Sequence, residues 1–427
     1  MNTAVSKHKT VVHKQVICPF CSLLCDDLTI QVHERELSLI ENRCPKARQG
    51  FEAAAPMLQP HIDGQTVSLD QAVKQAAILM KQAQQPLISG MGTDTAGSRA
   101  AMLLAEKSGA IIDHQAGDAI IRNMLVLQAN GWIMTTLSEV KNRADFILFL
   151  GTDTRKDYPR FMERFVYNKD SLFLKKTHPR NLASIGNALK LELPTGPGHK
   201  PPISIACPNT DLGDYVSALL GLVRGKNIPF TAISPRKLSR LKTIAEKLKS
   251  SKYSVLVWSP AALDFPHAEL TIQVICELIR ELNHSTRAAG LSLGGDNGSG
   301  TFMSVCAWQS GYPFRVSYAN KYPLYDPYNF STRKLLERSD IDLLFWLSSF
   351  QSEINIPENN IPKIILARPS NKPAPVAHVF IPVATPGIDH AGNLFRTDSV
   401  VSLPLKQLRS GHYPDAADVI NRINREI

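Results

Sequence analysis

Several features that would mark common protein classes are missing from this 427-residue sequence. No apolar run approaches the roughly 20 residues of a membrane-spanning helix. Residues 1–9 contain no apolar core of the kind found in secretory signals. Its twelve histidines form no His-x-His and no His-Glu-x-x-His motif, so a zinc hydrolase lacks its usual ligands. The net charge is +10, yet no basic run is interleaved with aromatic residues. We therefore expect no membrane and no nucleic-acid partner.

Cysteine is scarce and unevenly placed. The seven residues are an odd number, and none occurs between Cys44 and Cys207. This usage favours a reducing cytoplasm over a disulfide framework. Cys207, Cys276 and Cys306 lie in apolar segments, so we expect them to be buried small hydrophobes.

The clustered cysteines are the sharpest signal. Four of them have the spacing Cys-x2-Cys-x3-Cys-x18-Cys: Cys18, Cys21, Cys25 and Cys44. Four thiolates on a tight loop and a returning segment are typical of a [4Fe–4S] cluster. Zinc is an alternative, although its structural sites usually pair two Cys-x-x-Cys motifs. A third alternative is a reduced loop without metal. Basic residues beside the fourth cysteine would offset the negative charge of a cluster: Arg43, Lys46 and Arg48.

The rest of the chain predicts a doubly wound α/β fold, because short apolar runs ending in glycine alternate with amphipathic segments. We expect strands at 86–92, 146–150, 171–174, 203–207, 253–258, 341–347, 363–367 and 379–384. We expect helices from Ser68 or Asp70 onward and over 96–108, 212–223, 236–249 and 267–282. Ligands in such sheets bind beyond the carboxyl ends of the strands. The candidate cofactor-binding residues at these ends are Gly90, Gly92, Gly151, Thr152, Asp153, Gly294 and Asn297. Turn formation alone also explains glycine at these places.

A length of 427 residues suggests two or three lobes, and we expect four parts along the chain. These are a four-cysteine domain (1–60), a discontinuous first lobe (61–117 and 338–386), a second lobe (118–337) and a C-terminal segment returning to the first domain (387–427). The run 290–294 formally matches the nucleophile elbow of α/β-hydrolases. The glycine-rich stretch after it reads as a loop, so we expect no hydrolase serine there.

A family resemblance emerges from these motifs. The cysteine spacing is followed by Asp26-Asp27-Leu28, and further matches occur in order along the chain. They are 139–145, 151–154, Pro159-Arg160, 308–313 and 387–392 with Arg396 and Asp398. Together they resemble the B subunits of formylmethanofuran dehydrogenases, relatives of the molybdopterin oxidoreductases. The likeness is greatest to the bacterial branch, in which this chain type belongs to a formyltransferase/hydrolase complex.

The resemblance implies a molybdopterin-oxidoreductase-like fold whose glycine loops line two pterin guanine dinucleotides. Lys46 is similar to a lysine between cluster and pterin in that superfamily. The implied partners are an amidohydrolase-like protein (the A subunit), a formyltransferase (the D subunit) and the C subunit. The implied process is one-carbon metabolism linked to tetrahydromethanopterin. A glutamate-rich furan carrier is a further partner, and the basic segment 236–249 would suit its charge. The family's C-terminal dinucleotide-binding barrel is missing, which predicts a hetero-oligomer.

The redox site of the family is not matched. Its metal is bound by cysteine or selenocysteine followed by histidine, and Ala119 and Ile120 stand at that place. The family's active-site arginine falls at Leu293. Because a methyl group cannot donate a thiolate, we expect no molybdenum or tungsten pterin and no redox catalysis by this chain. The alternative is an active molybdenum or tungsten bis-pterin protein interconverting CO2 and formate.

Overall fold

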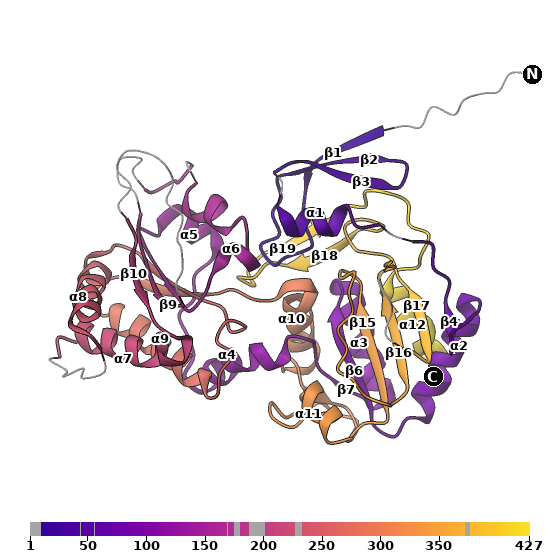
Figure 1. Cartoon of the computed structure of the whole chain (residues 1–427). Coiled ribbons are helices and arrows are strands. Elements are labelled where there is room, and N and C mark those ends of the chain that lie inside the picture. The colour runs from indigo at the N-terminus through magenta and orange to yellow at the C-terminus, as the bar shows by residue number, and fades with distance from the viewer. Residues whose placement is uncertain are drawn as a thin grey trace, which may run out of the picture. The chain divides into compact units, whose positions relative to one another are not determined.

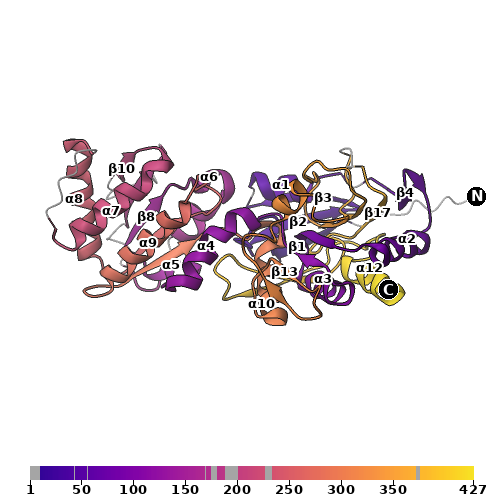
Figure 2. The same ribbon diagram turned by 90° about the horizontal axis from the view of Figure 1, so that it is seen from below.

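The chain folds into two compact units. The computed structural model describes residues 10–42, 44–54, 56–168, 170–174, 180–187, 201–226, 233–371 and 376–427. Unit 1 comprises Met1–Gly117 and Gly295–Ile427, and unit 2 comprises Asp118–Gly294. Unit 2 is therefore an insertion within unit 1. Figures 1 and 2 show the elements of each unit. None of the helices in the described part of the chain combines the length and apolar composition that a membrane crossing requires.

Unit 2 is built on a parallel five-stranded sheet with the order β10-β9-β8-β11-β12. Its strands are β8 (Phe146–Leu150), β9 (Asn181–Gly186), β10 (Ile203–Ala206), β11 (Ser254–Trp258) and β12 (Ala288–Ser292). Its helices are α5 (Leu137–Arg143), α6 (Thr154–Asp157), α7 (Leu212–Val223), α8 (Pro235–Ser250) and α9 (Ala268–Leu282). Every residue of β8 and β11 is buried, as expected of central parallel strands.

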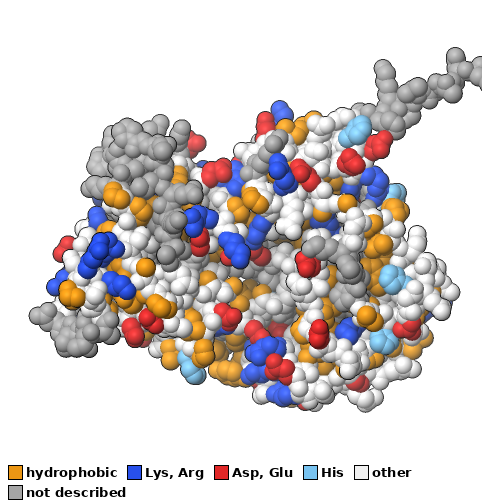
Figure 3. Space-filling model, viewed as in Figure 1, with side chains coloured by type: hydrophobic (Ala, Val, Ile, Leu, Met, Phe, Trp, Pro, Cys, Tyr) orange, Lys and Arg blue, Asp and Glu red, His pale blue; other side chains and the backbone are white. Residues whose placement is uncertain are grey.

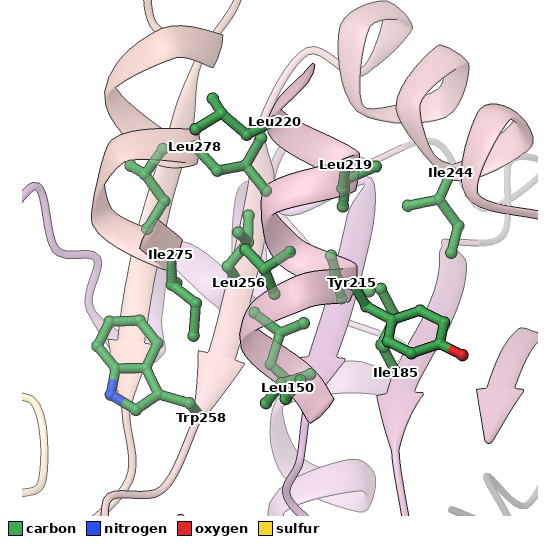
Figure 4. Packing of buried hydrophobic residues seen from close by; sticks show 14 of the residues in the cluster. Leu150, Ile185, Tyr215, Leu219, Leu220, Ile244, Leu256, Trp258, Ile275 and Leu278 are labelled. Atoms are coloured by element: carbon green, nitrogen blue, oxygen red, sulfur yellow. The ribbon is translucent and has the colours of Figure 1, made fainter. Parts of the chain in front are cut away.

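One hydrophobic core holds unit 2 together. Helix α7 packs against both α8 and α9. Figure 4 shows side chains of these helices meeting those of the strands, among them Leu150, Ile185, Tyr215, Leu219, Leu220, Ile244, Leu256, Trp258, Ile275 and Leu278. The apolar positions of α8 recur at helical spacing, with Leu241, Ile244 and Leu248 buried and the basic residues on other faces.

Unit 1 contains a nine-stranded sheet with the order β14-β13-β7-β6-β15-β16-β17-β4-β5. Its central strands are parallel: β7 (Ile111–Ile112), β6 (Pro86–Gly92), β15 (Leu343–Ser348), β16 (Lys363–Ala367) and β17 (Val379–Pro382). Short antiparallel strands flank them: β4 (His61–Ile62), β5 (Gln65–Thr66), β13 (Val316–Ser317) and β14 (Leu324–Tyr325).

The helices of unit 1 begin with clear local signals. Ser68 caps α2 (Leu69–Gln82) in a capping box with Gln71. Asp94 caps α3 (Thr95–Ser108), which ends at Gly109 in the left-handed region. Helix α12 (Ala416–Glu426) packs against α3 and α2, and these three helices lie together in Figures 1 and 2. The remaining helices of unit 1 are α1 (Pro45–Phe51), α10 (Ser299–Ser310) and α11 (Thr332–Glu337). Helix α4 (Gly117–Asn130) starts at the last residue of the first segment of unit 1 and otherwise belongs to unit 2.

A small antiparallel sheet carries the cysteine loop. Strands β1 (Thr10–Val16), β2 (Leu28–His33) and β3 (Glu36–Glu41) pair in that order. The loop between β1 and β2 packs against the hairpin of β18 (Gly392–Phe395) and β19 (Ser402–Leu405), because Ile17 and Leu24 share a cluster with Leu394 and Leu405.

The structure corrects two expectations. Residues 171–174 form bends rather than a strand, and the strand β9 begins at Asn181. Residues 295–337 belong to unit 1 and not to the second lobe, because α10 packs against α3 and β13 pairs with β7. The other strands and helices expected from the pattern are present, with ends that differ by at most a few residues.

Candidate functional site

The cysteine loop is compact and buried. Cys18, Cys21 and Cys25 are each at most 5% exposed, whereas Cys44 is half-buried. The backbone N–H of Cys18 donates to the carbonyl of Cys25 at 2.8 Å, and that of Leu24 donates to the carbonyl of Cys21 at 3.1 Å. These bonds fold the three cysteines into one tight turn.

The fourth cysteine reaches the same region from the start of α1. The Sγ of Cys44 accepts a hydrogen bond from the N–H of Ala47 at 3.3 Å. Burial raises the pKa of the Cys18 thiol well above its usual range, and the charges of Cys21, Cys25 and Cys44 add to this effect. Cys18 therefore lies within electrostatic reach of the other three cysteines.

The donor set can be compared with the groups that four cysteines bind. Among the described residues, no group of three or more His, Cys, Asp or Glu side chains is arranged to hold a metal ion. A single zinc would need four sulfurs at about 2.3 Å from one point. A cubane cluster spreads its thiolates more widely, because each binds a different iron. The four cysteines supply the four thiols that either group requires.

Lys46 lies beside the cysteine loop in an ion pair. Its Nζ is 3.0 Å from Oδ2 of Asp296, and both side chains are largely buried. The Oδ1 of Asp296 accepts the N–H of Ser22 at 2.8 Å, which ties the pair to the loop. Burial raises the pKa of Cys21, the charge of Asp296 adds to it, and Lys46 opposes it. Arg43 lies outside the described residues.

In unit 1, Gly92 and Asn297 come together at the carboxyl end of β6. A methyl group on Gly92 would lie 3.3 Å from Cα of Ser348 and 3.4 Å from the carbonyl of Asn297, whereas one on Gly90 would lie 2.7 Å from the carbonyl of Leu347. Four buried hydroxyls near this end have no hydrogen-bond partner: those of Thr93, Ser98, Ser348 and Ser349. Buried polar groups are normally paired, so this strand end fits a polar group such as a phosphate.

In the corresponding loop of unit 2, residues 151–153, polar groups form hydrogen bonds within the unit. The hydroxyl of Thr152 donates to the carbonyl of Leu150 and accepts the N–H of Ser259. Asp153 caps α6 and pairs with Arg155 at 2.6 Å, a bond that lowers its pKa. Gly151 adopts a φ of 62°, and its carbonyl accepts from the side-chain amide of Asn209. These three candidates therefore have turn-forming roles here.

In unit 2, apolar side chains occupy the positions at which the resemblance led us to expect the family's reactive groups. Ile120 is 5% exposed and Leu293 is fully buried. A methyl group on the candidate Gly294 would lie 3.2 Å from Cδ1 of Ile120. Ala119, in the first turn of α4, is half-buried.

The serine of the 290–294 run lacks the backbone geometry of a nucleophile elbow. Ser292 ends β12 without the positive φ of a strained elbow. Its Oγ accepts from the side-chain amide of Asn123 at 2.7 Å. Helix α10 does follow the loop, which the sequence pattern did not predict.

Two residues near the cysteine loop were not singled out from the sequence. Asp296 follows two glycines, and its acidic side chain there was the only available signal. Arg368 directly follows the apolar strand β16 and is 3% exposed. A charged residue at the carboxyl end of a buried strand is a usable signal.

Comparison with known proteins places the chain among related subunits. No family model matches. The chain is 25% identical over 406 residues to the B subunit of tungsten-containing formylmethanofuran dehydrogenase 2 of Methanocaldococcus jannaschii, covering 91% of this chain and 92% of that one. The same subunit of Methanococcus maripaludis is 25% identical over 419 residues. The B subunit of the formyltransferase/hydrolase complex Fhc of Methylorubrum extorquens is 25% identical over 336 residues, covering 78% of this chain and 87% of that one.

Solved structures agree with these relatives. The crystal structure of the formyltransferase/hydrolase complex FhcABCD from Methylorubrum extorquens with methylofuran contains a similar chain. That match has a TM-score of 0.73 and 25% identity, and covers 86% of this chain and 98% of that one. Acetylene hydratase from Pelobacter acetylenicus matches in fold alone, with a TM-score of 0.58 and 11% identity over 97% of this chain and 69% of that one. These likenesses confirm a mixed α/β, molybdopterin-oxidoreductase-like fold with parallel sheets. The chain is thus a homologue of the B subunits of formylmethanofuran dehydrogenases and of the formyltransferase/hydrolase complex.

Proposed function

We propose that the chain is the B subunit of a formyltransferase/hydrolase-type complex in tetrahydromethanopterin-linked one-carbon metabolism, and that it has lost its own redox site. Its similarity to the B subunit of Fhc over most of both chains supports the first part. The observation that carries the second part is the packing of Ile120 beside Gly294, with Leu293 buried next to it. A buried isoleucine offers no ligand to molybdenum or tungsten.

The metal and cofactor assignments follow the same residues. The four thiols would hold a [4Fe–4S] cluster, which supplies electron transfer or structural support when bound. The strand-end hydroxyls of Thr93, Ser98, Ser348 and Ser349 would hold phosphates if a dinucleotide is kept without its metal. Unit 2 offers fewer polar groups to a phosphate, because those of its Gly151 loop are hydrogen-bonded within the unit.

Exposed aromatic side chains support the proposed partners. Trp308, Tyr322 and Tyr328, within one segment of unit 1, are 56–62% exposed. Aromatic residues are enriched at protein interfaces, and monomers avoid large apolar patches. The proposed partners are the amidohydrolase-like A subunit, the formyltransferase D subunit, the C subunit, together with the furan carrier.

Charge gives weaker guidance. On the face shown in Figure 3, basic and acidic side chains are interspersed. Three basic residues of α8 bond to neighbouring groups: Lys237 to Tyr215, Arg240 to the carbonyl of Ser204 and Lys247 to Asn181. These contacts favour a structural role for much of the basic helix over binding of an acidic tail. All seven cysteines are free thiols, which supports the proposed cytoplasmic location.

Purification of the chain with its partner subunits tests the proposal. We expect a stable complex with formyltransferase activity. It should contain no molybdenum or tungsten and should not catalyse viologen-linked formate oxidation. Stoichiometric tungsten or molybdenum, with formate oxidation abolished by Cys21→Ala, would favour the active alternative. A monodisperse monomer that does not bind the other subunits would overturn the assignment to the complex.

A further inference from the structure

Arg368 occupies an unusual position for an arginine. It follows β16, its backbone N–H donates to the carbonyl of Ser348 at 2.9 Å, and it is only 3% exposed. Burying a guanidinium is expensive unless its charge is balanced. Burial lowers the pKa of Arg368 to about 10, so the side chain stays positively charged at neutral pH.

No described acidic side chain forms an ion pair with this guanidinium. Its hydrogen bonds go to the carbonyls of Gly50 at 2.8 Å and Phe350 at 3.4 Å. The carboxylate whose charge affects it most is Asp389. That carboxylate is already paired with Arg409 at 2.8 Å, and the charge of Arg409 opposes it. Arg396, which is 14% exposed, pairs with Asp398 at 2.7 Å, whereas Arg368 forms no such pair with any described residue.

The face of Phe20 links this charge to the cysteine loop. The Cζ of Arg368 lies 5.6 Å from the centroid of the Phe20 ring. Phe20 stands between Cys18 and Cys21, and its ring also packs edge-on against Phe51 of α1 at 5.0 Å. The positive charge therefore contacts the aromatic side chain that stands between two of the four cysteines. Four thiolates around an iron–sulfur core give that centre a net negative charge, which is the balance that Arg368 lacks.

We propose that Arg368 is the buried counter-charge of the four-cysteine site, a positioning residue that stabilises a negatively charged thiolate-ligated centre from the protein side. This inference rests on the proposed function, in which the four cysteines hold such a centre. Net charge and surroundings set the reduction potential of iron–sulfur clusters. Removing a nearby positive charge disfavours adding an electron, so it lowers that potential.

A purely structural role makes a different prediction. If Arg368 served only to tie the carbonyls of Gly50 and Phe350 together, a neutral donor would replace it. Glutamine keeps donors but no charge, whereas lysine keeps the charge with a different donor geometry. Arg338 supplies a control charge, because it also belongs to unit 1 but is 42% exposed and pairs with Asp340 at 2.7 Å.

The experiment reconstitutes the full chain anaerobically with iron and sulfide and titrates the cluster signal against potential. We expect Arg368→Gln to shift the reduced-to-oxidised ratio at least tenfold toward oxidised, about 59 mV for one electron. Arg368→Lys and Arg338→Gln should stay within threefold of the wild type. If Arg368→Gln takes up no iron, uptake by Arg368→Lys still supports the role of charge.

Two results would overturn the idea, and they are distinguishable. A wild-type chain that binds no iron would refute the proposed thiolate centre itself. A wild-type cluster whose potential is unchanged in Arg368→Gln, or whose iron uptake is lost equally in the lysine and glutamine variants, would refute the counter-charge role alone.

Discussion

The substitution Gly50→Ala should loosen the cysteine loop. Gly50 is buried near the end of α1, and a methyl group there would lie 2.2, 2.3 and 2.4 Å from three ring atoms of Phe20. Carbon atoms in contact are normally about 3.5–4.0 Å apart, so the ring must retreat by more than ~1 Å. It cannot do so without disturbing its edge-on contact with Phe51 and its contact with Arg368.

The expected loss is about 2 kcal/mol of unfolding free energy. Overpacking costs about 1–3 kcal/mol, and the lost aromatic pair adds about 0.5–1.5 kcal/mol. Alanine returns about 0.5–1 kcal/mol, because it suits a helix better than glycine. For a unit of this size the thermal midpoint should fall by about 4–8 °C.

Thermal unfolding of the metal-free chain under anaerobic conditions measures this loss. Gln49→Ala is the control, since it changes an exposed neighbour on the same helix and should stay within about 0.5 kcal/mol. A Gly50→Ala chain that melts with the wild type or above it would refute the steric reasoning.

Three further outcomes are expected. Ser68→Ala should destabilise α2 by about 1 kcal/mol, measured by hydrogen exchange of that helix; unchanged exchange would contradict the capping box. The metal-free chain should lose stability above pH 9, because unfolded thiols ionise near their ordinary pKa of 9.0 while burial keeps Cys18 and Cys21 protonated. The free energy of unfolding keeps this contribution below pH 9 and falls above it by at most about 1.4 kcal/mol per pH unit per thiol. Urea unfolding at several pH values measures the fall, and the same dependence on pH in a Cys18→Ala/Cys21→Ala chain would refute this. Trp308→Ala should weaken assembly with the partner subunits at least tenfold in a binding titration, whereas Leu270→Ala, also exposed, should not; equal effects would argue against the aromatic segment as the interface.

Local signals predicted most elements of the fold. Residues 212–223 and 363–367 match α7 and β16 to the residue, because an apolar pattern at one period decides such segments. The same apolar signal wrongly predicted a strand at 171–174. Leu172 and Phe173 are exposed there, and these residues take part in no described strand pairing. The chain's return to unit 1 at Gly295 depends on tertiary contacts of α10, which no local pattern encodes.

The candidate site was predictable only where spacing carries the chemistry. Four cysteines at cluster spacing identified the loop, and Lys46 lies beside it. The partner of Lys46, Asp296, is 250 residues away in sequence. Arg368 and Gly50 are likewise far apart in sequence. A single sequence can therefore point to a charged residue but not to the distant group that it contacts.

The insertion of unit 2 within unit 1 determines the order in which the two units can fold during synthesis. Unit 2 is continuous, so it can fold as soon as Gly294 has left the ribosome. Strand β6 must wait for β15, its partner more than two hundred residues later. Until then its apolar residues and the cysteine loop lack the neighbours that bury them, and β18, β19 and α12 arrive last of all. Nascent chains are thus exposed to aggregation and thiol oxidation for most of translation, and chaperones acting at this stage would serve unit 1 more than unit 2.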